Sequence, residues 1–177
     1  MTKEKVDKPP YDERPDDDKL NANWIKAKNL FERRDFSASV VRIATSAEIA
    51  ANIYVRKFLI VEHELPSSYV DALLVSANGL DGKYKRLIKP AAALKNTWND
   101  LKSLQKKIQA LHDHRNGVVH NGKFKSEPDA KVAFEEGLAI IKGLAPDESK
   151  KLTVPTMGSK ITSAKKKKRD SSDTKQD

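Results

Sequence analysis

The sequence predicts an all-α fold, in which four or five amphipathic helices with short connections form an antiparallel bundle. Three observations lead to this prediction. Between residues 21 and 146 the apolar side chains recur every three or four positions, which is the period of an α-helix. No segment there alternates with the period of two that a strand requires. With only two Trp, five Phe and four Tyr, the core must be mainly Leu, Ile, Val and Ala, which favours helices.

The first half of the bundle is predicted from three apolar stripes. A short stripe ends near Arg34-Asp35, a long one is stopped by Pro66, and a third ends at the turn pair Asn78-Gly79. The residues of these stripes are, in order, Trp24, Ala27, Leu30 and Phe31; Val40, Ala44, Ala47, Ala51, Tyr54 and Phe58; and Val70, Leu73, Leu74 and Ala77.

The second half begins at Pro90, which suits the first turn of a helix. One continuous helix is expected to carry the next stripe, which runs from Leu94 to Leu111 and includes Trp98 as a core residue. After a turn at Asn121-Gly122, Ser126 is a candidate N-cap for the last helix. That helix carries a stripe from Ala130 to Ala145, and Pro146 closes it.

Composition divides the chain into three parts. Residues 1–20 and 147–177 lack apolar periodicity and are predicted to be disordered charged tails around a bundle at 21–146. The net charge of +9 is concentrated in the bundle, which fits a polyanionic partner such as nucleic acid or a solvated lysine-rich surface. The block Lys165–Arg169 is a nucleic-acid arm, a nuclear localisation signal or simply a solvated tail.

Several classes of protein are excluded by composition. The chain has no Cys, so it has no disulfide, thiolate metal site or cysteine nucleophile. It has neither the apolar segment of a signal peptide nor an apolar run of about 18–20 residues that could span a membrane. It contains neither a glycine-rich phosphate loop nor a nucleophile elbow. A cytoplasmic protein without cofactors and without membrane partners is expected.

The segment Arg115-Asn116-Gly117-Val118-Val119-His120 carries the chemistry that distinguishes this chain. Arg is always charged and offers a planar fork of donors to phosphate, and the imidazole of a His can take and give a proton near neutrality. Together with the amide of Asn116, they could handle a phosphodiester without a metal. Because residues five apart on an α-helix point about 140° apart, a bend at Asn116-Gly117 is expected to bring Arg115 and His120 together.

This segment resembles the Arg-polar-x-x-x-His signature of the HEPN superfamily, whose domains are helical bundles. The resemblance covers roughly residues 22–145, and only the short motif is specific. It implies a HEPN-like bundle and a metal-independent endoribonuclease of a toxin–antitoxin or phage-defence system. It also implies RNA as the substrate, a homodimer with facing motifs, and an antitoxin or other regulatory protein as a partner. Other members of the superfamily bind RNA or protein without cleaving it, so a binding module is the alternative.

The resemblance also assigns roles to individual residues. His120 would be the general base or acid, Arg115 would hold the scissile phosphate, and Asn116 would support the phosphate or His120. Glu48 is a weaker candidate, which would orient Arg115 or His120. In the alternative without catalysis, Arg115 and Asn116 only cap the C-terminus of a helix, where cations are favoured, and His120 is a polar residue between helices.

Neighbouring residues are open to other interpretations. Arg56 and His63 also have a loose Arg-to-His spacing, but Lys57 follows Arg56 where the signature requires a polar uncharged or acidic residue or His. His112 and His114 crowd the motif, but His-x-His on a helix points in two directions, so no metal site is predicted. Lys123 and Lys125 could contact an RNA backbone or could be ordinary loop lysines.

Overall fold

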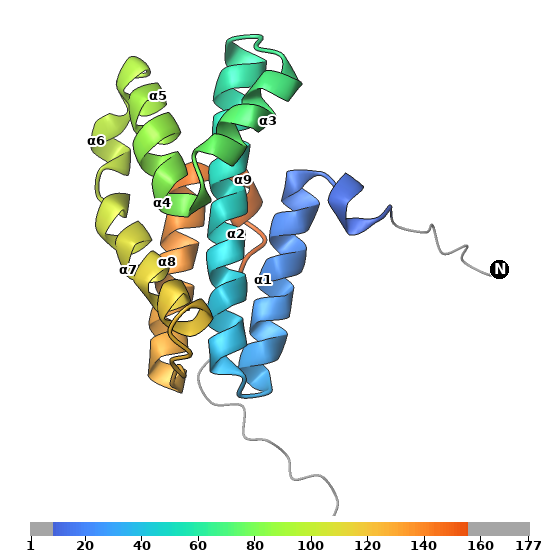
Figure 1. Cartoon of the computed structure of the whole chain (residues 1–177), viewed down its shortest axis with the longest axis vertical. Helices are drawn as coiled ribbons and strands as arrows, with labels where there is room; N and C mark the ends of the chain where they lie inside the picture. The colour runs from blue at the N-terminus through green and yellow to red at the C-terminus, as the bar shows by residue number, and fades with distance from the viewer. Residues whose placement is uncertain (1–8, 156–177) are drawn as a thin grey trace, which may run out of the picture.

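A computed structural model of the chain describes residues 9–155, and in that range the protein is helical and has no strand. The all-α prediction is therefore confirmed. Four long helices form the body: α1 (Asp16–Glu32), α2 (Phe36–Arg56), α7 (Leu104–Val119) and α8 (Glu127–Leu144). Figure 1 shows α2 between α1 on one side and α7 and α8 on the other. None of the helices in the described part of the chain is long and apolar enough to cross a membrane.

Helix α2 is the central element because its core-facing side chains are mostly small. Small residues let neighbouring helices approach closely, and α1 and α8 both pack along α2. The buried small residues of α2 are Ser39, Ala44, Ser46, Ala47, Ala50 and Ala51. Larger side chains fill the space beside them: Trp24 of α1 meets Phe134 of α8 edge to face, with ring centroids 5.3 Å apart.

Shorter helices extend the bundle at one end. Helix α2 runs without interruption into the π-helical segment η2 (Lys57–Glu62), and α3 (Ser67–Ser76) folds back against it. Helix α4 (Gly79–Lys83), the π-helical segment η3 (Tyr84–Ile88) and α5 (Lys89–Leu94) then form one path, which α6 (Trp98–Leu101) connects to α7. Tyr84 joins this path to the bundle, because its hydroxyl donates to the Leu101 carbonyl at 2.7 Å.

The predicted turns explain where the helices begin and end. Asp35 caps α2 by accepting from the Ala38 amide, after Arg34 has turned the chain with a φ of 64°. Ser126 is the N-cap of α8, as predicted from the sequence, and it also forms a capping box with Asp129. Pro90 lies in the first turn of α5, which is also the predicted position.

The expected continuous helix across Leu94–Leu111 is wrong. Helix α5 ends at Leu94, and Asn96 adopts a left-handed conformation with a φ of 56°, which stops a helix. Leu94 is consequently 75 % exposed, whereas Leu101, Leu104, Ile108 and Leu111 are buried as predicted. Trp98 packs against the core from a partly buried position.

The helical part of the chain extends further at both ends than the sequence predicted. After a 3-10 turn, η1 (Tyr11–Glu13), α1 begins at Asp16, where three aspartates suit the positive end of the helix dipole, and Leu20 is fully buried. At the other end α9 (Pro146–Ser149) follows α8, and the Trp24 indole donates to the Thr153 carbonyl at 2.9 Å. The rest of both tails, including Lys165–Arg169, lies outside the described residues.

The contact between α2 and α8 leaves no room for a side chain at Gly137. A Cβ there would lie 2.4 Å from Cγ2 of Ile43, a buried and branched side chain that has little freedom to move. We expect Gly137→Ala to lower the free energy of unfolding by about 1–2 kcal/mol, because overpacking outweighs the better helix propensity of Ala. Urea unfolding measures this difference.

Gly143 of the same helix is the matched control. A Cβ there would approach Leu104, at 2.7 Å from its Cδ1 and 3.5 Å from its Cδ2 and Cγ, and this side chain is not branched at Cβ, so it adjusts more readily than Ile43. Gly143→Ala should therefore change the stability less than Gly137→Ala does. Equal losses from the two substitutions would contradict close packing at Gly137.

Candidate functional site

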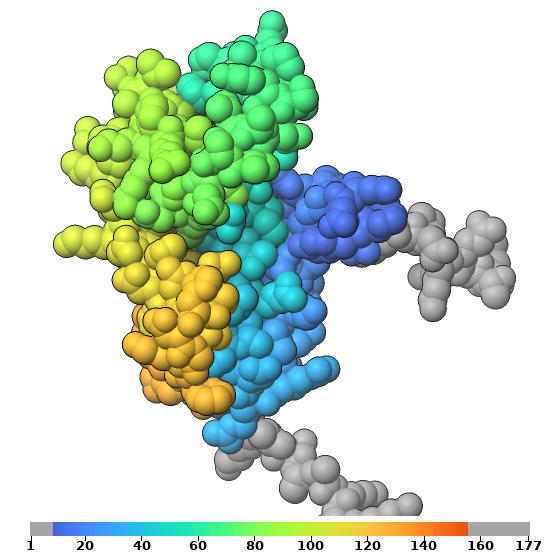
Figure 2. Space-filling view, viewed as in Figure 1, coloured from blue at the N-terminus to red at the C-terminus, as the bar shows by residue number. Residues whose placement is uncertain are grey.

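A cleft of about 330 Å³ opens where α2, α4 and the C-terminal half of α7 meet. These segments adjoin on the face shown in Figure 2, in cyan, green and yellow respectively. The start of α4 forms one wall with its N-cap Asn78 and with Gly79 and Leu80, and Leu111 and Ala44 form the apolar floor. Besides Asn78, the polar side chains that line the cleft are Glu48, His112, Arg115, Asn116 and His120.

The cleft thus contains every candidate site residue that the sequence suggested. Glu48 comes from α2, Arg115 and Asn116 from the last turns of α7, and His120 from the C-cap of α7. Arg115 and Asn116 are half-buried, whereas His120 is exposed rather than packed between helices. Because these residues line one cleft, a single ligand could contact all of them.

The expected bend at Asn116-Gly117 is wrong, because α7 continues to Val119. The chain turns later, at Gly122, which has a φ of 61°, and the Lys123 amide closes the turn by donating to the Gly117 carbonyl at 2.9 Å. His120 is therefore the first residue past the helix. It reaches the cleft from the helix end, and Arg115 reaches it from the helix side.

A short hydrogen-bond chain organises the cleft. Arg115 Nη1 donates to Asn116 Oδ1 at 3.4 Å, and the other end of the same amide lies 2.7 Å from His112 Nε2. Since a guanidinium can only donate, the amide oxygen must face Arg115 and the amide nitrogen must face His112. His112 Nε2 must then accept, which leaves its ring proton on Nδ1.

Glu48 has a different partner from the one expected. Its carboxylate is 2.7 Å from the ammonium of Lys83, a lysine of α4 that is only 6 % exposed. The ion pair joins α4 to α2 across the base of the cleft. Glu48 is thus engaged by Lys83 and makes no hydrogen bond to Arg115 or His120 in the described structure.

His114 lies on another side of α7 from the cleft. Burial of its imidazole and the nearby Lys125 ammonium lower its pKa, although Asp129 and Asp113 oppose this change. Its Nδ1 is buried and has no hydrogen-bond partner among residues 9–155. His112 and His114 therefore do point in different directions, and no cluster of three or more His, Cys, Asp or Glu that could hold a metal occurs in those residues.

The second Arg and His pair is built into other contacts. Arg56 forms ion pairs with Asp16 and Asp71, at 3.1 and 2.6 Å. The Nδ1 of His63 donates to the Phe58 carbonyl at 2.9 Å, and its ring packs on Phe58. Neither side chain lines the cleft.

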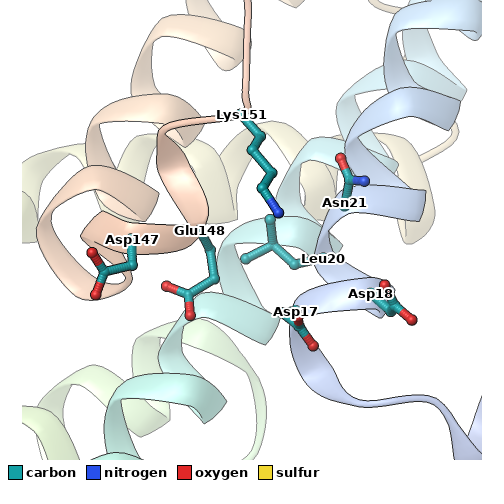
Figure 3. Close-up of a pocket in the computed structure, with 7 residues that line it drawn as sticks. All are labelled: Asp17, Asp18, Leu20, Asn21, Asp147, Glu148 and Lys151. Atoms are coloured by element: carbon teal, nitrogen blue, oxygen red, sulfur yellow. The ribbon is translucent and has the colours of Figure 1, made fainter.

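A second hollow on the surface is lined mainly by acidic side chains. Figure 3 shows it between the start of α1 and the segment around α9, with Lys151 extending toward Leu20. Four carboxylates and one lysine surround it: Asp17, Asp18, Asp147, Glu148 and Lys151. This surface would repel a polyanion, so a nucleic acid would be directed to another part of the molecule.

Comparisons with known proteins leave the site to be interpreted from its own geometry. The chain matches no protein-family model, and searches of curated proteins and of solved structures give no match.

The fold brings two further side chains, His112 and Lys83, to the site, and the sequence analysis did not assign either of them a role there. His112 is four residues before Asn116, and this spacing places both on one helix face, so the pair could have been noticed. Lys83 is 35 residues from Glu48, and no local pattern connects them.

The hydrogen-bond chain predicts the tautomer of His112. Long-range ¹H–¹⁵N NMR at a pH where imidazoles are neutral should find the proton on Nδ1, the same tautomer as in His63, which serves as an internal standard. Asn116→Ala should release His112 from this tautomer and leave His63 unchanged. A proton on Nε2 of His112 in the unaltered chain would contradict the arrangement.

The lowered pKa of His114 makes stability depend on pH. Below the ordinary His value of 6.5, the unfolded chain takes up a proton that the folded chain resists, so the free energy of unfolding falls as the pH falls. His114→Gln should reduce this fall between pH 7.5 and 5, and Lys125→Met should reduce it less. The comparison is made by urea unfolding above pH 5, where the lowered pKa values of Asp129 and Glu127 contribute little. An unchanged slope in His114→Gln would refute this origin.

Proposed function

We propose that the chain is a metal-independent endoribonuclease of the HEPN type. The observation that carries the proposal is the joint occurrence of Arg115, Asn116 and His120 around one cleft, with the spacing of the Arg-polar-x-x-x-His signature. An imidazole can act as the base and a fixed cation can stabilise the developing charge when RNA supplies its own nucleophile, and an amide can hold a phosphate oxygen.

In the proposed reaction, His120 removes the proton of an RNA 2′-hydroxyl. The 2′-oxygen forms a bond to phosphorus, the bond from phosphorus to the 5′-oxygen breaks, and the 5′-oxygen takes a proton from water. His120 returns its proton to the hydroxide that this leaves, so the imidazole is neutral again. Arg115 neutralises the charge that develops on the phosphate oxygens. The products are a 2′,3′-cyclic phosphate and a 5′-hydroxyl. DNA, which has no 2′-hydroxyl, would not be cleaved.

The remaining polar residues would support these two. Asn116, held by His112, sets the position of the Arg115 guanidinium before substrate arrives, which reduces the reorganisation needed in the transition state. Glu48 is already neutralised by Lys83, so it would not compete with RNA for Arg115. This role for Glu48 differs from the orienting role that the family resemblance implies.

The proposal includes a biological context taken from the resemblance alone. The chain would act in the cytoplasm as a toxin or defence effector, as a homodimer whose two clefts form a composite site, under the control of an antitoxin or another regulatory protein. The exposed position of His120 at the end of α7 is compatible with such a facing arrangement.

A non-catalytic RNA- or protein-binding module is the second candidate. One observation favours it. Arg115 is hydrogen-bonded to Asn116 and Glu48 to Lys83, and neither Arg115 nor Glu48 is hydrogen-bonded to His120 in the described structure. Such a site could hold a phosphate without turnover.

Labelled single-stranded RNA incubated with the full chain in EDTA distinguishes the two candidates. We expect cleavage to cyclic-phosphate ends, a loss of about 10²–10⁴-fold in His120→Ala, and a loss of about 10²–10³-fold in Arg115→Ala. His63→Ala and Arg56→Lys are the matched controls and should retain activity. The rate should change within pH 5–8, the range in which imidazoles change charge.

The outcomes are separable. Binding without cleavage, on varied RNAs, would favour the binding module. Cleavage that survives His120→Ala, or a rate that is flat from pH 5 to 8, would remove His120 from the chemistry. Light scattering on the same preparation gives the number of copies, and a strict monomer would contradict the composite site.

A further inference from the structure

The loop between α7 and α8 presents an aromatic ring to solvent. Phe124 is 95 % exposed, more than any other large apolar side chain in the described structure, and it stands between Lys123 and Lys125. A single exposed apolar side chain is common on protein surfaces. This one is distinctive because the backbone around it is fixed, its neighbours are cations, and the candidate site begins four residues away.

The backbone is held on both sides of Phe124. On one side the Lys123 amide donates to the Gly117 carbonyl at 2.9 Å, and on the other the Lys125 amide donates to Ser37 Oγ, also at 2.9 Å. The capping box of Ser126 follows at once. The ring is therefore displayed from an anchored loop, so little conformational entropy would be lost when a ligand stacks on it.

The flanking lysines give the loop its charge. Both side chains pass close to Gly117 of α7, where an added Cβ would lie 3.6 Å from Lys123 Cδ and 3.9 Å from Lys125 Nζ. An exposed aromatic ring flanked in the chain by two lysines is a combination that binds single-stranded nucleic acid, since the ring stacks on a base and the cations contact phosphates. Phe124 cannot lie more than about 14 Å from His120, the span of four extended residues.

We propose that Phe124, Lys123 and Lys125 form a base-stacking subsite for a single-stranded segment of RNA that leads into the cleft. This inference rests on the proposed function and extends it by assigning the residues that hold the strand beside the scissile phosphate. A second copy of the chain is a less suitable occupant, because a symmetric contact through this loop would bring the lysines of both copies together.

The test measures RNA binding by fluorescence anisotropy, with the full chain carrying His120→Ala so that RNA is not consumed. Phe124→Ala should weaken binding of a labelled single-stranded oligonucleotide by about 5- to 100-fold, the effect of losing one stacked base. It should leave binding of the matching duplex unchanged. Because Phe124 has almost no protein contacts, the substitution leaves no cavity in the fold.

Two further variants make the result specific. Phe124→Trp should keep the affinity, and the fluorescence that it adds should be quenched by the single strand. The chain with Phe124 retained contains the same two native tryptophans, the buried Trp24 and the partly buried Trp98, and gives the background signal. Lys123→Ala with Lys125→Ala should reduce the salt dependence of binding. Tyr69→Ala, which removes an exposed aromatic ring from α3, is the matched control and should change nothing.

Each contrary outcome identifies what fails. Unchanged affinity in Phe124→Ala together with an unquenched Phe124→Trp overturns the subsite, while cleavage by the unaltered chain keeps the proposed function. A shift from dimer to monomer in Phe124→Ala, with RNA affinity unchanged, assigns the loop to self-association instead. If the unaltered chain neither binds nor cuts RNA, both the subsite and the proposed function fall.

Discussion

The close approach of α8 to α2 is the constraint on which the rest of the structure depends. It requires a residue without a side chain at 137, and it places Ile43 and Phe134 in contact with the core around Trp24. Because α7 packs on both α2 and α8, its position follows from theirs. The cleft is the space left where α7 and α2 diverge toward α4, so the distance between two core helices determines where Arg115 and Glu48 can meet a ligand.

The ion pair between Lys83 and Glu48 connects stability with the chemistry of the cleft. A buried ammonium without a counter-charge would cost several kcal/mol, so the Glu48 carboxylate is what allows Lys83 to hold α4 against α2. The same contact occupies the carboxylate that could otherwise neutralise Arg115. One pair thus holds α4 beside the cleft and leaves the guanidinium available to an anion, because among residues 9–155 its side-chain hydrogen bond goes to the amide of Asn116.

The sequence predicted the features that local patterns encode. The helical class and the N-cap at Ser126 follow from periodicity and capping chemistry, and the short motif names Arg115, Asn116 and His120. Glu48 was placed with them by the family resemblance alone, and the bend that was expected to bring Arg115 and His120 together is absent. The sequence did not predict the stop at Asn96, because the apolar stripe continues across a residue whose left-handed backbone interrupts the helix. The partner of Glu48 was also missed, since a long lysine side chain can stay in solvent or turn inward, and only tertiary packing decides between them.

The hydrogen bond from the Trp24 indole to the Thr153 carbonyl changes where the independently folding unit ends. Hydropathy alone would end it at Pro146, yet Leu152 is buried and Thr153 satisfies the largest aromatic side chain of the core. A polypeptide shortened to residue 146 would leave that indole N–H without its acceptor and one side of α1 uncovered. The smallest autonomous folding unit therefore includes the ten or so residues after α8, because they pack against α1 and complete the core.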